Sequence, residues 1–191
     1  TPHDALLHGI SMVHQELEQV RDRNVMENVW LGRLPLKHGL IDTKKMYEDT
    51  KTVLSSLEEE AVPDPAEKLS NLTVSKRQLV DIAKAISYNC DIITLDEPTS
   101  SLNEKEVEIL MGIIKGLKEQ GKGIIYISHK MEEIKKISDE VSIMRDGTMI
   151  GTWNAADLTT DMIISKMVGR DMSNRFPPKT NKPGEVYMRV E

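Results

Sequence analysis

The sequence of 191 residues has one cysteine, Cys90, few aromatic residues (4%) and no excess of positive charge. A single cysteine permits no internal disulfide and is consistent with a reducing compartment. A nucleic-acid surface needs a basic stripe and aromatic rings for stacking, whereas the formal net charge of this chain is −6. We therefore expect no nucleic acid among its partners.

Long apolar runs and targeting signals are also absent from the sequence. No run approaches the roughly 18 apolar residues that span a bilayer. The first residues, 1–4, have neither the basic nor the apolar region of a signal peptide, and they lack an initiator methionine. We expect a piece of a longer protein that is soluble by itself.

Two adjacent carboxylates, Asp96 and Glu97, follow the mostly apolar residues 92–95, and Pro98 stops the run. Such a run predicts a fully buried parallel strand with the carboxylates at its C-terminal end, where open α/β sheets bind ligands. Neighbouring side chains on a strand point to opposite sides, so Asp96 can face a metal ion and Glu97 a water. This arrangement suits metal-assisted phosphoryl transfer. The alternative is a solvated Asp-Glu pair in a turn.

Residues 123–129 predict a second buried strand that ends in His129, 32 residues after Glu97. In a parallel sheet the ends of both strands lie on the same edge, so we expect His129 and the carboxylates to meet there. A lone histidine after a strand is more often structural, and this alternative stays open on the spacing alone.

The remaining pattern predicts alternating strands and helices, with a mainly helical stretch between residues 18 and 88. Residues 171–184, rich in proline and lysine, predict a linker, and 185–191 the first strand of another domain. Asp146-Gly147 predicts a hairpin turn. The other expected strands are 10–14, 139–145 and 148–153, and the expected helices are 24–33, 42–60, 103–120, 130–138, 159–168 and one that follows residues 72–78.

The string from Asp96 to Asn103 resembles the Walker B segment and D-loop of ABC-type ATPases. Gln15, after the first strand, is similar to the Q-loop glutamine of the sugar-importer members, and residues 127–134 and 167–186 are also similar to theirs. Residues 72–76 resemble the signature Leu-Ser-Gly-Gly-Gln, with departures: Thr73 replaces serine, Val74 and Ser75 replace both glycines, and Lys76 replaces glutamine. Side chains at the glycine positions weaken the close approach of backbone to a phosphate, and the charge of Lys76 partly compensates.

The resemblance implies an α/β fold: a truncated P-loop NTPase of the ABC ATPase type, with a parallel sheet core (1–17 and 89–170) and a mainly helical signature subdomain (18–88). It also implies ATP and Mg²⁺ as cofactors. The implied catalytic residues are Glu97 as the base and His129 and Gln15 as sensors of the terminal phosphate. The implied metal ligands are Asp96 and Gln15. The implied nucleotide contacts are Leu72, Thr73, Val74, Ser75, Lys76, Ser101 and Asn103.

The implied function is the ATP-hydrolysing subunit of a monosaccharide importer. Its partners would be membrane permease subunits, a second nucleotide-binding domain and, indirectly, a sugar-binding protein, at the cytoplasmic face of the inner membrane. One alternative is a non-catalytic docking module on a permease. Another is a chromosome-maintenance ATPase, against which the acidic balance and the lack of coiled-coil heptads argue.

The phosphate-binding motif Gly-x-x-x-x-Gly-Lys-Ser/Thr does not occur in these residues. The nearest approach, Gly121-Lys122-Gly123, is read as a helix stop. We therefore expect the chain alone neither to bind ATP tightly nor to hydrolyse it. We also expect that without upstream strands it exposes apolar surface and associates non-natively.

Overall fold

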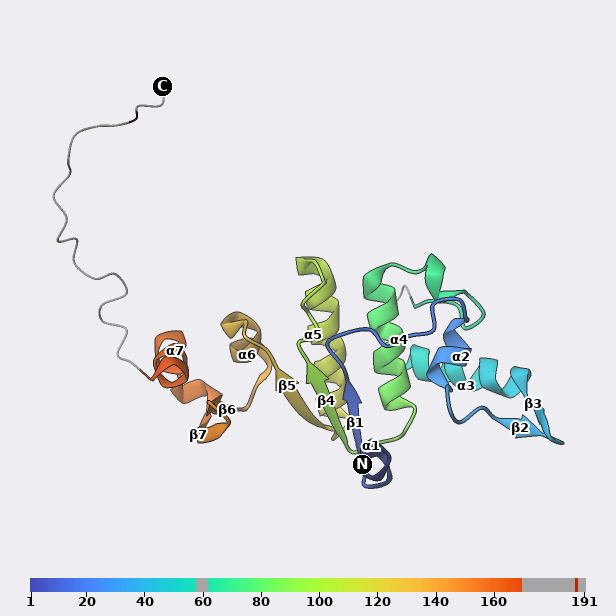
Figure 1. Cartoon of the computed structure of the whole chain (residues 1–191), viewed down its shortest axis with the longest axis horizontal. Coiled ribbons are helices and arrows are strands. Elements are labelled where there is room, and N and C mark those ends of the chain that lie inside the picture. Colours follow the sequence, from blue (N-terminus) through green and yellow to red (C-terminus); the bar gives the residue numbers. More distant parts are fainter. Residues whose placement is uncertain (58–61, 170–187, 189–191) are drawn as a thin grey trace. The chain divides into compact units, whose positions relative to one another are not determined.

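A computed structural model describes residues 1–57, 62–169 and 188 of the chain (Figure 1). Contacts divide it into two compact units, Thr1–Ile137 and Ser138–Glu191, which are considered separately. The predicted linker at 171–184 lies outside the described residues, as do the glutamates at 58–60 and, except for Met188, the predicted strand at 185–191.

The first unit is built on a parallel sheet of three strands in the order β1-β4-β5 (Figure 1). These strands are β1 (Ile10–Val13), β4 (Ile92–Asp96) and β5 (Gly123–Ile127). Val13 pairs with Leu95, and Asp96 pairs with Ile127. The C-terminal ends of the three strands therefore share one edge, and the predicted α/β class with a parallel core is confirmed.

Two helices cover one face of this sheet, α4 (Val74–Ile86) and α5 (Glu104–Glu119). Alternate strand residues point into the core beneath them: Val13, Ile93 and Leu95 are at most 2% exposed. Leu79, Val80 and Ile82 of α4 and Leu110, Ile113 and Ile114 of α5 complete this core. Cys90, just before β4, is buried as a small apolar residue.

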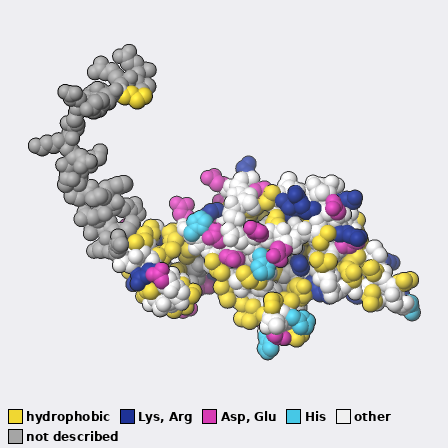
Figure 2. Space-filling model, in the orientation of Figure 1, with side chains coloured by type: hydrophobic (Ala, Val, Ile, Leu, Met, Phe, Trp, Pro, Cys, Tyr) yellow, Lys and Arg dark blue, Asp and Glu magenta, His cyan; other side chains and the backbone are white. Residues whose placement is uncertain are grey.

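The other face of the sheet is open, and here the prediction of fully buried strands is wrong. Ile10, Met12, Ile125 and Ile127 are 37%, 44%, 51% and 45% exposed. The physical reason is that α4 and α5 both pack on the opposite face, which buries only every second strand residue. Hydrophobic side chains gather in the space-filling view over β1 and β4 (Figure 2).

The three helices predicted between β1 and β4 are present. This stretch contains α2 (Val25–Val29), α3 (Thr43–Ser55), a 3-10 turn η1 (Leu69–Asn71) and α4. Asn24 caps α2 and Asp42 caps α3. Helix α3 ends at residue 55 rather than 60, where the hydroxyl of Ser56 donates to the carbonyl of Val53 at 2.7 Å.

A short hairpin of β2 (Leu36–Lys37) and β3 (Leu40–Ile41) lies between α2 and α3 and is not predicted by the sequence pattern. Beside it, the guanidinium of Arg33 packs over the rings of Trp30 and Tyr88, at 4.3 and 3.9 Å from their centroids. It also donates to the carbonyls of Val29 and Ser87. Burial lowers the pKa of Arg33, and the side chain ties the end of α2 to the end of α4.

Two short helices complete the first unit, α1 (Pro2–Leu7) and α6 (Met131–Ile137). Helix α1, which the sequence analysis does not predict, is nucleated by Thr1, whose side chain caps it, and by proline in its first turn. Among the described residues, no helix has the length and apolar character to cross a bilayer.

The second unit is a hairpin covered by one helix. Strands β6 (Glu140–Arg145) and β7 (Thr148–Asn154) are antiparallel, followed by the 3-10 turn η2 (Ala155–Asp157) and α7 (Thr160–Val168). Asp146 and Gly147 both have positive φ, +50° and +74°, as the predicted tight turn requires. The ammonium of Lys166 lies 4.2 Å from the ring centroid of Trp153.

Candidate functional site

The two carboxylates differ in backbone position. Asp96 is the last residue of β4, whereas Glu97 lies beyond the strand with φ +42°. The amide of Glu97 donates to the carbonyl of Ile127 at 2.9 Å. The turn, rather than strand alternation, therefore sets the direction of Glu97. A non-glycine residue at positive φ is uncommon and is often found at functional sites.

His129 and Glu97 are in direct contact. Nδ1 of His129 lies 2.8 Å from Oε1 of Glu97, and the two side chains are 67% and 25% exposed. Since a carboxylate only accepts, Nδ1 of His129 donates, which leaves its Nε2 free for a ligand. The predicted meeting of the imidazole and the acid on one edge is confirmed, and the chemical roles of the two residues stay a prediction.

A buried carboxylate lies behind this pair. Glu133 of α6 is 8% exposed, and its Oε2 accepts hydrogen bonds from Tyr126 (2.7 Å), Thr99 (2.9 Å) and Ser128 (3.3 Å). Its Oε1 lies 3.2 Å from Nζ of Lys130. The loops after β4 and β5 therefore share one acceptor.

The network shifts the titration of its members. Burial raises the pKa of Tyr126, and the hydrogen bond to Glu133 raises it further. For Glu133, burial alone would raise the pKa. The bonds from Tyr126, Thr99 and Lys130 outweigh burial, so its pKa lies below the ordinary value. Glu133 is accordingly an ionised acceptor at neutral pH.

Gln15 follows β1 by two residues and is exposed. Because Val13 pairs with Leu95, Gln15 and Glu97 each stand two residues beyond paired positions of neighbouring parallel strands. Both residues therefore lie at the C-terminal edge of the sheet. The predicted role of Gln15 toward metal and phosphate stays a prediction.

The signature-like segment forms the start of α4. Thr73 is its N-cap: the hydroxyl accepts from the amide of Lys76 at 3.4 Å and lies 3.0 Å from that of Ser75. Val74 is 36% exposed, whereas Leu72 is 9% exposed and belongs to the core. The side chain of Leu72 therefore packs in the core, and the predicted nucleotide contacts of residues 72–76 stay a prediction.

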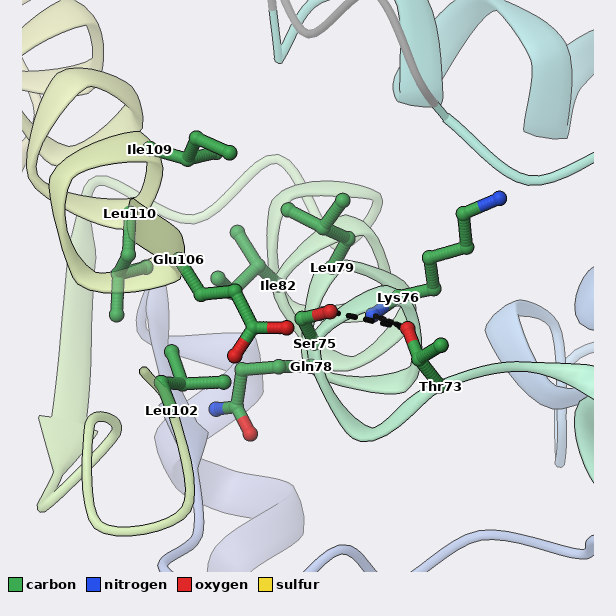
Figure 3. A pocket seen from close by; sticks show the side chains of 10 residues that line it. All are labelled: Thr73, Ser75, Lys76, Gln78, Leu79, Ile82, Leu102, Glu106, Ile109 and Leu110. Atoms are coloured by element: carbon green, nitrogen blue, oxygen red, sulfur yellow. Dashed lines mark hydrogen bonds between the residues drawn. The ribbon is translucent and has the colours of Figure 1, made fainter. Parts of the chain in front are cut away.

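A pocket of about 120 Å³ separates the beginning of α4 from the beginning of α5 (Figure 3). Ser75 and Glu106 both line it, and the influence of the Ser75 hydroxyl, together with the hydrogen bond from the backbone amide of Asn103 at 2.9 Å, lowers the pKa of Glu106. Gln78 is 4% exposed, and its Nε2 has no partner in the described part of the chain. The lining residues are Thr73, Ser75, Lys76, Gln78, Leu79, Ile82, Leu102, Glu106, Ile109 and Leu110.

The two predicted D-loop contacts differ in availability. Asn103 is the N-cap of α5. Its side-chain Oδ1 accepts a hydrogen bond from the backbone amide of Glu106 at 3.1 Å, and its backbone amide donates to Glu106 Oε2 at 2.9 Å. Ser101 is exposed. The structure thus brings the signature-like residues together with the start of α5, and Glu97 together with His129.

Comparison with known proteins decides the family. Residues 1–100, more than half of the chain, match the family model described as ABC transporter. The chain belongs to the ABC transporter family. The predicted resemblance is therefore confirmed at the level of the family.

Curated members of the ABC transporter family match almost the whole chain. The galactose/methyl galactoside import ATP-binding protein MglA of Clostridium tetani is 64% identical over 98% of this chain and 38% of its own length. The protein of the same name from Mannheimia succiniciproducens is 56% identical over 100% of this chain and 37% of its own length. The chain thus spans less than two fifths of these relatives.

Solved ABC transporter cassettes share the fold. The cassette MJ1267 superposes with a TM-score of 0.72 at 20% identity, over 88% of this chain and 70% of the cassette. A dimeric cassette, MJ0796 bound to ADP and Pi, gives 0.61 at 24% identity, over 76% of this chain and 62% of that one. At these identities the likeness concerns the fold.

Resemblance to ABC-type ATPases implies Mg²⁺, and the strand ends can be tested for it. The described residues contain no cluster of three or more His, Cys, Asp or Glu side chains that could hold an ion. Mg²⁺ is usually held by one or two carboxylates together with phosphate oxygens and water. Asp96, at the open end of β4, therefore fits an ion that arrives with a nucleotide.

Sequence reasoning did not assign a role to Glu133. The signal was present, because Glu133, Ile134 and Ile137 share one face of α6 by helical spacing. An acid on the apolar face of a short helix indicates a buried acceptor with specific donors.

Proposed function

We propose that this chain is part of the ATP-hydrolysing subunit of an importer of galactose and methyl galactosides. The observation that carries the proposal is the contact between Glu97 and His129 at the C-terminal edge of a parallel sheet. The names and the 54–64% identity of the MglA relatives support the sugar class. Within the chain, we assign 1–17 and 89–170 to the ATPase core and 18–88 to the signature subdomain.

In the proposed reaction, Glu97 orients and deprotonates the water that attacks the terminal phosphate of ATP. In its doubly protonated form, the imidazole of His129 donates through Nδ1 to Glu97 and through Nε2 to the phosphate, where its positive charge stabilises the developing negative charge. Gln15 contacts the same group. Asp96 would hold Mg²⁺, which when bound neutralises phosphate charge.

The proposed assembly follows from the family. Residues 72–76 would cover a nucleotide bound by a second nucleotide-binding domain, with Ser101 and Asn103 beside it. Permease subunits would hold the protein at the cytoplasmic face of the inner membrane, and a sugar-binding protein would deliver the substrate. The exposure of Thr73 and Val74 at the start of α4 supports this role.

The rival function is a non-catalytic docking module. Val74 and Ser75, which replace the two glycines of the signature, favour it because their side chains hinder close approach to a phosphate.

Galactose-stimulated ATP hydrolysis discriminates between the two functions. The full-length product of the gene would be reconstituted with its permease and sugar-binding protein in liposomes. Stimulated phosphate release supports the importer. Binding to the permease without hydrolysis supports the docking module and contradicts the proposal.

A further inference from the structure

The carboxylate of Glu133 is placed to align the site without touching the reactants. Its Oε2 accepts hydrogen bonds from the hydroxyl groups of Tyr126, Thr99 and Ser128, at 2.7, 2.9 and 3.3 Å. Three donors on one oxygen fix that oxygen relative to both strands. Since Glu133 is 8% exposed, water cannot easily replace a lost partner.

These hydroxyls belong to the two segments that carry Glu97 and His129. Thr99 stands two residues after Glu97 in the loop that follows β4, and Ser128 immediately precedes His129 after β5. One carboxylate therefore holds both loops. A change in its bonding would alter the distance between the loops, and with it the 2.8 Å contact between His129 and Glu97.

Lys130 contacts both Glu133 and Thr99. Its ammonium lies 3.2 Å from Oε1 of Glu133 and donates to both the carbonyl and the hydroxyl of Thr99, each at 3.1 Å. The backbone amide of Lys130 donates to Ser128 Oγ at 3.0 Å. The charge of Glu133 is thus balanced locally, and the network has charge-assisted bonds in both directions.

We propose that Glu133 is a positioning residue, which holds the loops after β4 and β5 at the spacing that lets His129 and Glu97 act on one phosphate. This inference rests on the proposed ATPase function. Because Glu133 acts through the loops, its loss lowers the rate of the chemical step and leaves ATP binding intact. Small misplacements of reacting groups lower rates by about 100-fold.

The test compares Glu133→Gln with Glu132→Gln in the full-length gene product. Glu132 is the exposed neighbour on the same helix and loses the same charge. The amide at 133 keeps the shape, but one of its two polar atoms donates instead of accepting, and the negative charge that pairs with Lys130 is lost. We expect kcat to fall about 10- to 100-fold in Glu133→Gln, with KM for ATP within about twofold of the wild type, and no change in Glu132→Gln.

A second comparison separates alignment from a general loss of folding. In a His129→Ala background, Glu133→Gln should lower kcat little further, because there is no imidazole left to align. Tyr126→Phe removes one hydroxyl and keeps the ring, so it should lower kcat by a smaller factor, again without a change in KM. If Glu133→Gln does not fold, Tyr126→Phe carries the test.

The outcomes are distinct. An active wild type with an impaired His129→Ala variant, but with Glu133→Gln and Tyr126→Phe as active as Glu132→Gln, overturns the inference and leaves the proposed function standing. Equal losses from Glu133→Gln with and without His129 also overturn it. A wild-type protein without ATPase activity overturns both.

Discussion

Nδ1 of His129 lies 2.8 Å from Oε1 of Glu97, although 32 positions separate the two residues in the chain. Pairing of β4 with β5 accounts for the contact. Asp96 is opposite Ile127, and Glu97 and His129 follow these two strand ends by one and two residues. The hydrogen bond that the backbone amide of Glu97 donates to the carbonyl of Ile127 fixes the turn. The pair is therefore a property of the sheet edge rather than of flexible side chains alone.

Glu97→Gln should trap ATP in the full-length gene product. The amide keeps the size of the side chain but cannot take a proton from water, so hydrolysis should fall by about 10²- to 10⁴-fold while nucleotide remains bound. Phosphate release and filter retention of labelled ATP measure the two effects. Glu132→Gln is the matched control, and unchanged steady-state hydrolysis by Glu97→Gln would remove Glu97 from its proposed role.

The isolated chain of 191 residues should not bind Mg-ATP with micromolar affinity. Its sequence has no Gly-x-x-x-x-Gly-Lys-Ser/Thr loop to surround the phosphates with backbone amides. Isothermal titration calorimetry checks this, with the full-length gene product as the comparison. A micromolar dissociation constant for the isolated chain would show that the described strand ends suffice for binding.

Asp81 should make the stability of the chain depend on pH in a defined direction. Burial raises the pKa of Asp81 in α4, against the lowering effects of the hydrogen bond from Gln19 and of nearby cations. A raised folded-state pKa contributes stability below the unfolded-state pKa, and this contribution is lost as pH rises through the folded-state value. In Asp81→Asn the side chain is uncharged at every pH, and its Oδ1 can still accept the hydrogen bond from Gln19.

The free energy of unfolding of Asp81→Asn, relative to the wild type, should therefore increase as pH rises above the ordinary aspartate pKa, and level off once Asp81 is ionised in the folded state. Urea unfolding at several pH values measures the difference, with Asp22→Asn, an exposed carboxylate, as the control. A difference that decreases with rising pH would contradict the assignment of burial as the dominant cause.

The open face of the sheet should cause the isolated chain to self-associate. Ile125 and Met12 are 51% and 44% exposed on adjoining parts of one apolar face, and such contiguous surface favours association. Light scattering at increasing concentration should show oligomers, reduced in Ile125→Lys. Leu36→Lys, on the β2-β3 hairpin and 69% exposed, should have a smaller effect. A monomeric wild-type chain at all concentrations would contradict the prediction.

Local features of the fold were predictable because short-range chemistry fixes them. Asn24 and Asn103 cap the helices expected after them, and each side chain accepts from the backbone amide of the glutamate three residues later. Asp146-Gly147 forms the expected hairpin turn. Glu97, directly after β4, and His129, after β5, meet because parallel strands share an edge, a rule that needs only element order.

Other features depended on tertiary contacts that the sequence pattern does not encode. The apolar sequence of β5 predicts a strand that is buried on both faces. Whether Ile125 is covered depends instead on which elements pack on each face of the sheet. The hairpin at 36–41 has strands of two residues, too short for a periodic signal. Helical spacing in α6 marks Glu133 as a buried acid, but it does not show the donors: Thr99 belongs to the loop after β4, whereas Tyr126 and Ser128 belong to β5 and the residue directly after it.

The most direct measurement is a double-mutant cycle on single-turnover ATP hydrolysis by the full-length gene product. The four proteins are the wild type, Glu97→Gln, His129→Ala and the double variant, with His3→Ala, exposed on α1, as a control. If the pair acts as a unit, the double variant is no slower than the slower single variant. Wild-type hydrolysis by His129→Ala, or losses that multiply independently, would contradict the account.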